Sequence, residues 1–184
     1  MPFHKSNFNI PKTVINTKMN SVKFRSMKII VFSIFIILVD QISKISVLLS
    51  LGFDRSKNII PNLLNFSLVK NTGAAFSLFS NSTTILTITS ILASALLVIV
   101  ILNFPPKSYW NSIGLAYLLG GTVGNGMDRL FKGYVLDFIE IVPINFPIFN
   151  VADIAINIAI LYFIIDMIST KGKSEKNKKS SISN

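Results

Sequence analysis

The sequence predicts an all-α membrane protein with four transmembrane helices and a small sheet outside the membrane. Three observations lead to this fold class. Apolar residues make up 51% of the 184 residues, only 14% are charged and the mean hydropathy is +0.59, values that do not fit a soluble domain of this length. Apolar runs long enough to cross a bilayer alternate with polar stretches. Positive charge is concentrated near the two ends of the chain.

The first two predicted spans are residues 29–51 and 83–104. At 1.5 Å per residue, the 23 residues of the first span cross a hydrocarbon core about 30 Å thick. This span contains Asp40 and Lys44, which are four residues apart and therefore lie on one face, where they can pair with each other or face a polar interior. The second span carries no charge, which indicates a packing helix.

The third predicted span, residues 108–127, is rich in glycine. Gly120 and Gly124 have the spacing that allows helices to approach closely in a membrane. Near the outer end of this span, glycine also lets Asn125 and Arg129 crowd into a site. We expect the helix to end around Asp128.

The fourth predicted span is residues 149–169, with Asp153 one turn below its outer end. Asn150, Asp153 and Asn157 follow at helical spacing and form one polar stripe on an otherwise apolar helix. Asp166 lies near the inner end beside a basic stretch, where interfacial solvation explains it, and we assign it no role.

Two outer loops are expected, 52–82 and 128–148, and the first is expected to form a small sheet that rests on the bilayer. Residues 65–70 alternate as a strand does, and the following NTGAAFS at 71–77 predicts a tight turn whose backbone approaches another group closely. Residues 134–142 are also strand-like and place Asp137 at the membrane surface.

The topology follows from the distribution of charge. Of the eighteen Lys and Arg residues, six lie before Ile29 and five after Thr170. These stretches, 1–28 and 170–184, are predicted to be mostly disordered, basic cytoplasmic tails on either side of a membrane domain at 29–169. The charge indicates topology and a contact with anionic lipids, not nucleic-acid binding. If both termini are cytoplasmic, the number of spans must be even, and the four predicted spans satisfy this condition.

Two absences narrow the possible chemistry. The sequence contains no Cys and has His4, in the N-terminal tail, as its one His. A thiol nucleophile is therefore excluded, and a His-based triad or a zinc site is improbable. Carboxylates remain the main candidates for acid and base catalysis.

Asp137 and Asp153 are the two carboxylates that we expect to work together, because both lie at the outer edge on opposite sides of a connection that can fold back. When two carboxylates are close, one keeps a proton while the other is ionised, which supplies an acid and a base at one pH. An aspartic peptidase uses such a pair to activate water and to polarise the peptide carbonyl. We interpret Asp128 and Arg129 as a structural ion pair at a helix end.

Three other functions are alternatives to an aspartic peptidase. A small transporter or proton-conducting protein also places charges inside the membrane, but the sequence shows no internal repeat and its polar residues gather on one side. A Ser-Lys peptidase would use Ser43 or Ser46 with Lys44, yet adjacent helical residues point about 100° apart. A purely structural scaffold does not need three aspartates on its outer side.

The chain resembles the lipoprotein signal peptidases, the type II signal peptidases of bacterial membranes, from about Ile30 to Ile168. The resemblance rests on five blocks in the same order: VDQISK at 39–44, NTGAAFS at 71–77, GNGMDR at 124–129, VLDF at 135–138 and FNVAD at 149–153. Each block alone is unspecific, whereas five in register across four spans are highly specific. The long basic tails depart from the family pattern.

The resemblance implies a membrane aspartyl endopeptidase without metal or cofactor, inhibited by globomycin-type peptides. Such enzymes remove the signal peptide of prolipoproteins on the amino side of a diacylglyceryl-modified cysteine. The family fold is a four-helix bundle with a small extracytoplasmic β-cradle and a surface helix, in the bacterial cell membrane, with the active site at the outer face. Partners are prolipoproteins and membrane lipids, not nucleic acid, and we expect a monomer. The implied catalytic pair is Asp137 and Asp153, and the implied supporting or substrate-binding residues are Asp40, Lys44, Asn71, Gly73, Asn125, Asp128, Arg129, Asn150 and Ala152.

Overall fold

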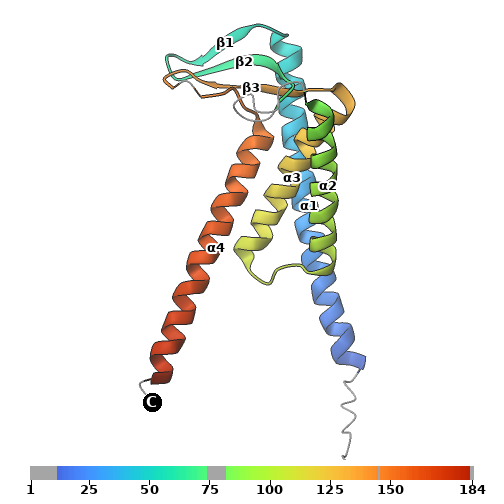
Figure 1. Cartoon of the computed structure of the whole chain (residues 1–184), viewed down its shortest axis with the longest axis vertical. Coiled ribbons are helices and arrows are strands. Elements are labelled where there is room, and N and C mark those ends of the chain that lie inside the picture. Colours follow the sequence, from blue (N-terminus) through green and yellow to red (C-terminus); the bar gives the residue numbers. More distant parts are fainter. Residues whose placement is uncertain (1–11, 74–81, 145, 183–184) are drawn as a thin grey trace, which may run out of the picture.

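A bundle of helices carries a small sheet at one end (Figure 1). The computed structural model describes residues 12–73, 82–144 and 146–182, of which 12–18 and 172–182 are described as backbone only. The helices are α1 Lys12–Leu51, α2 Thr83–Asn103, α3 Tyr109–Lys132 and α4 Val151–Ile182, and the strands are β1 Ser56–Ile60, β2 Leu64–Asn71 and β3 Val135–Ile141. The start of α1 and the end of α4 both lie at the end of the bundle away from the sheet.

Three of the helices are long and apolar enough to cross a membrane: Met19–Leu51 within α1, the whole of α2, and Val151–Lys171 within α4. Helix α3 lies in the centre of the bundle and packs against α1, α2 and α4. Because its neighbours cover it, α3 can carry more polar residues than a helix that faces lipid. That α3 also spans the membrane stays a prediction.

The glycines of α3 let the other helices come close, as their spacing predicts. A Cβ atom at Gly120 would lie 2.7 Å from the Cβ of Ile36 on α1. A Cβ at Gly121 would lie 2.5 Å from the carbonyl oxygen of Ala152 on α4. Real Cβ atoms do not approach other atoms so closely, so a larger residue at either position would push α1 or α4 away from α3.

The three strands form an antiparallel sheet in the order β1-β2-β3. The strands predicted around 65–70 and 134–142 are confirmed as β2 and β3. Strand β1 was not predicted, because its five residues are all exposed and show no apolar alternation. A buried cluster of Val47, Leu68, Leu136 and Phe138 packs the sheet against the C-terminal end of α1. The described residues contain no separate surface helix.

The prediction of disordered tails is wrong where the structure describes them. Helix α1 already begins at Lys12, and α4 continues to Ile182. No Gly or Pro interrupts α1, and Gly172 weakens α4 by only about 1 kcal/mol, so each helix propagates beyond its apolar span. The remaining residues of the tails, including His4, lie outside the described residues.

Helix α3 ends one turn later than predicted, at Lys132. Gly133 has a φ of 79°, and its N–H donates to the carbonyl of Arg129, which is a usual way for glycine to end a helix. Asp128 and Arg129 therefore lie within the helix. At the other end of α3, Ser108 and Asn111 donate to Asp166, so this carboxylate joins α4 to α3 rather than being merely solvated.

Candidate active site

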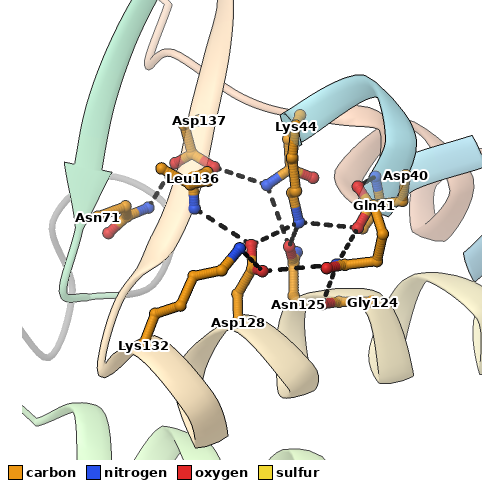
Figure 2. Close-up of polar contacts among 12 residues, drawn as sticks. Asp40, Gln41, Lys44, Asn71, Gly124, Asn125, Asp128, Lys132, Leu136 and Asp137 are labelled. Atoms are coloured by element: carbon orange, nitrogen blue, oxygen red, sulfur yellow. Dashed lines mark hydrogen bonds and ion pairs between the residues drawn. The ribbon is translucent and has the colours of Figure 1, made fainter. Parts of the chain in front are cut away.

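Polar side chains from five elements meet at the end of the bundle that carries the sheet (Figure 2). Helices α1 and α3, the ends of β2 and β3, and the start of α4 each contribute. The predicted site residues found here are Asp40, Lys44, Asn71, Gly73, Asn125, Asp128, Arg129, Asp137, Asn150, Ala152 and Asp153. Residues 74–77 of the predicted turn lie outside the described residues.

Asp137 is held on β3 with only 2% of its surface exposed. Its Oδ2 accepts a hydrogen bond from Asn71 Nδ2 at 2.8 Å, and its Oδ1 accepts one from Asn150 Nδ2 at 2.6 Å. Burial, together with the nearby negative charge of Asp153, raises the pKa of Asp137 to about 6 against these two hydrogen bonds. This carboxyl group therefore keeps its proton at a higher pH than an ordinary aspartate.

Asp153 lies in the first turn of α4 and takes part in a reciprocal helix cap. The backbone N–H of Asn150 donates to Asp153 Oδ2 at 3.1 Å, and the backbone N–H of Asp153 donates to Asn150 Oδ1 at 3.0 Å. Asn125 Nδ2 donates to the other carboxylate oxygen, Oδ1, at 2.8 Å. Asn150 therefore donates to both aspartates, and each of the four carboxylate oxygens of Asp137 and Asp153 accepts an N–H.

Lys44 lies at the centre of the buried charges, and its side chain is 0% exposed. Its Nζ lies 2.8 Å from Asp40 Oδ2, 3.0 Å from Asp128 Oδ2 and 2.9 Å from Asn125 Oδ1. Asp40 and Lys44 thus do both things that their spacing allows, because they pair with each other and also lie among other polar groups. Lys132 adds a second cation, 2.7 Å from Asp128 Oδ1, so two acids and two bases balance each other. Buried charges are tolerated when they are paired in this way.

The predicted ion pair between Asp128 and Arg129 is wrong. Asp128 pairs with Lys44 and Lys132, because Lys132 is one turn along the same helix face whereas adjacent residues point apart. Asp128 Oδ2 also accepts the backbone N–H of Leu136 at 3.3 Å. This contact fixes the residue immediately before Asp137.

Arg129 instead reaches the turn after β2, where its Nη2 donates to the carbonyl of Gly73 at 3.2 Å. The backbone N–H of Gly73 donates to Asn71 Oδ1 at 2.9 Å. Since the oxygen of the Asn71 amide is used in the turn, its NH₂ group points to Asp137. The turn and the carboxylate are therefore positioned together.

Sequence reasoning missed Gln41, whose Nε2 donates to Asp40 Oδ2, to the carbonyl of Gly124 and to Asp128 Oδ1. It also missed the contact of Lys132, although the spacing of four residues from Asp128 is a signal for it. Gly124 is needed beside Asp40, because a Cβ there would lie 2.7 Å from Asp40 Oδ2.

The two aspartates open into a cavity of about 910 Å³. Its polar end includes Asp137, Asp153 and Arg129, and its apolar wall follows α4 through residues such as Ile154, Ile158 and Leu161. A cavity of this size accommodates a peptide segment or an acyl chain. In the described part of the chain, no group of three or more His, Cys, Asp or Glu side chains is arranged to hold a metal ion.

The comparisons with known proteins agree with one another. The family model of signal peptidase (SPase) II matches residues 32–169. The chain is 45% identical to a lipoprotein signal peptidase of Parasynechococcus marenigrum over 139 residues, which cover 76% of this chain and 87% of the relative. It is 33% identical to a lipoprotein signal peptidase of Streptococcus agalactiae over 153 residues, which cover 83% of this chain and 99% of the relative.

Two solved structures share the fold, and both are bacterial membrane enzymes. The match with the first structure has a TM-score of 0.73 and 28% sequence identity, and it covers 79% of this chain and 90% of the other. The match with the second structure has a TM-score of 0.68 and 29% sequence identity, and it covers 76% of this chain and 92% of the other. With the three apolar helices described above, these matches show a bacterial membrane protein. The chain belongs to the signal peptidase II family.

Proposed function

We propose that this protein is a membrane aspartyl endopeptidase that removes signal peptides from prolipoproteins, with Asp137 and Asp153 as its catalytic residues. The cleaved bond lies on the amino side of a cysteine that carries a diacylglyceryl group. One observation above all supports this proposal. Two carboxylates from separate parts of the chain are joined through Asn150 at the polar end of a cavity with an apolar wall.

We assign different roles to the two aspartates. The pair shares one proton, and we place it on Asp137, whose pKa is raised by burial and by the nearby charge of Asp153. Asp153 lies at the N-terminus of α4, where the helix dipole favours a negative charge. In the proposed reaction, ionised Asp153 takes a proton from water and the water oxygen attacks the peptide carbonyl carbon. Asp137 donates its proton to the carbonyl oxygen.

The tetrahedral intermediate then collapses, the C–N bond breaks and the leaving amine takes up the proton that Asp153 removed from water. The products are a carboxyl group on the signal peptide and a free amino group on the cysteine. The carbonyl re-forms and returns a proton to Asp137, so both aspartates recover their starting states. No atom other than those of water and the substrate is consumed.

The membrane arrangement is part of the proposal. We place four spans within a peptidase domain at 29–169, with both termini in the cytoplasm and the active site at the outer face. Basic residues at the end of the bundle away from the sheet support this orientation, since cytoplasmic ends are enriched in Lys and Arg. They include Lys23, Arg25 and Lys28 on α1 and Lys171 on α4.

The test uses Asp137→Asn and Asp153→Asn in the full-length protein. Each substitution removes a carboxyl group that accepts or donates a proton in the reaction while keeping nearly the same shape, so we expect a loss of turnover of at least roughly a thousandfold with the thermal melt retained. Purified protein is incubated with a precursor with and without the lipid on its cysteine, and with and without globomycin. Near wild-type turnover by either variant would refute the catalytic pair. Equal cleavage of the unlipidated precursor would refute the proposed substrate.

A further inference from the structure

Lys44 has a buried ammonium group that the proposed reaction does not use. We propose that Lys44 is a positioning residue: it fixes the orientation of the Asn125 and Asn150 side-chain amides, and these amides point their N–H groups at the two catalytic aspartates. The inference rests on the proposed function, because it assigns to Lys44 an effect on that same pair. It follows from which groups can donate and which can accept.

The orientation of the Asn125 amide follows directly from Lys44. An ammonium group only donates hydrogen bonds, so the Asn125 atom 2.9 Å from Lys44 Nζ must be the oxygen, Oδ1. The NH₂ group of Asn125 then faces Asp153 Oδ1, to which it donates at 2.8 Å. A flipped amide would place NH₂ against the ammonium and the oxygen against the carboxylate. Both contacts would be repulsive, and burial of Lys44 and Asn125 makes such repulsion costly.

The orientation of the Asn150 amide is set by two contacts, one with Asn125 and one with the backbone of Asp153. Asn150 Nδ2 donates to Asn125 Oδ1 at 3.0 Å and to Asp137 Oδ1 at 2.6 Å. Its own oxygen accepts the backbone N–H of Asp153 at 3.0 Å. The chain of contacts therefore leads from one ammonium group to a donor on each aspartate, through two amides whose side chains are buried.

The alternative is that Lys44 only neutralises its neighbours. Asp128 has a second cation in Lys132, at 2.7 Å, so Lys44 is not the sole counter-charge for Asp128. Asp40 accepts the backbone N–H of Ala152 through Oδ1, while its Oδ2 faces Lys44. An asparagine at position 40 can keep the acceptor for Ala152. Charge can therefore be removed from both partners at once without leaving a buried charge unpaired.

The experiment compares two double variants, Asp40→Asn with Lys44→Gln and Asp40→Asn with Lys44→Met. They have the same net charge and side chains of similar length, but only glutamine can donate to Asn125 Oδ1. We expect kcat of the methionine variant to be lower than that of the glutamine variant by roughly 10-fold or more, with KM unchanged within about twofold. Equal kcat values in the two variants, with similar thermal melts, would overturn the inference.

A second measurement applies if the double variants fail to fold. In the wild-type protein labelled with ¹⁵N at asparagine, the Asn125 side-chain amide is assigned by the signal that Asn125→Asp removes. We expect both side-chain N–H groups to exchange slowly with solvent and to have a high ¹⁵N order parameter, because the amide is held in one orientation. An amide averaged between two orientations would overturn the inference.

The same assay separates this inference from the proposed function. If Asp137→Asn or Asp153→Asn still cleaves the lipidated precursor, the catalytic pair is wrong, whatever the Lys44 variants do. If both of those variants are inactive while the glutamine and methionine variants match, only the role of Lys44 is wrong.

Discussion

In the proposed orientation the outer half of the helical bundle lies next to the sheet and the inner half lies away from it, and different forces hold the two halves together. Near the sheet, α1, α3 and α4 meet through ion pairs and hydrogen bonds around Lys44. Towards the other end, α1, α2 and α3 meet through a cluster of buried apolar side chains: Ile29, Ile101, Ala116 and Leu119. The same central helix therefore has a polar half and an apolar half.

The difference predicts unequal tolerance of substitution. In a bilayer, apolar side chains gain little by leaving lipid for a protein interior, so the inner half is stabilised mainly by close packing. A buried ion pair or amide in the outer half depends on each of its partners, because removing one leaves the other unpaired. Small substitutions should therefore have small effects in the inner half of the bundle and large effects in the outer half.

The largest effect is expected from Gly124→Ala. The new Cβ would lie 2.7 Å from Asp40 Oδ2 and 3.4 Å from the Cβ of Ala152, so α1 and α4 must move where the aspartates are positioned. We expect turnover of the lipidated precursor to fall by about 100-fold or more. Ala116→Gly in the inner half is the matched control and should leave kcat within about twofold, although a helix-interior glycine lowers stability by about 1 kcal/mol. Unchanged turnover in Gly124→Ala would show that the outer contact is loose.

Asp128→Asn should lower the free energy of unfolding by about 3 kcal/mol, because it breaks a buried pair with Lys44 and a second pair with Lys132. Ile101→Val, which trims a fully buried side chain in the inner cluster, should lower it by only about 1 kcal/mol. Denaturant unfolding in a mild detergent measures both values. Similar losses in the two variants would contradict the proposed division of the bundle.

The pH dependence of stability should also come from the outer half. In the folded protein the pKa of Asp137 is raised from 3.8 to about 6, so folding favours the protonated form. This contribution is fully present at low pH and is lost as the pH rises through about 6, by at most about 3 kcal/mol. The melting temperature should fall mainly between about pH 4 and pH 6, because in this interval the unfolded chain has lost the proton that the folded protein still holds.

Asp137→Asn is the control, because it has no proton to lose at this position. Its melting temperature should change much less over the same range. Parallel curves for the variant and the wild type would assign the pH dependence to other groups, with Asp153 the nearest candidate.

The smallest effects are expected from two buried serines in the inner half. Ser26 Oγ donates across the bundle to the carbonyl of Ile101 at 2.6 Å, whereas Ser33 Oγ donates within its own helix to Ile29 at 2.9 Å. Ser26→Ala should lower stability by about 1 kcal/mol and Ser33→Ala by less than about 0.5 kcal/mol. Equal values from thermal melts would mean that the contact between α1 and α2 contributes nothing measurable.

Much of this arrangement can be predicted from the sequence, because apolar runs and single charges within them are local signals. The three most apolar helices, strands β2 and β3 and the Asp40–Lys44 pair are of this kind. The partners of Asp128 depend on how α1, α3 and β3 meet, which no local pattern reveals. The helical tails were missed because composition predicts disorder even where a stable helix continues into a polar stretch.

The cap at the start of α4 gives the Asp153 side chain two roles. Asp153 completes the first turn of the helix and is also a proposed catalytic residue. If the first turn of α4 unfolds locally, the Asp153 carboxylate also leaves its position in the proposed active site. Catalytic turnover should therefore be sensitive to local unfolding of this turn.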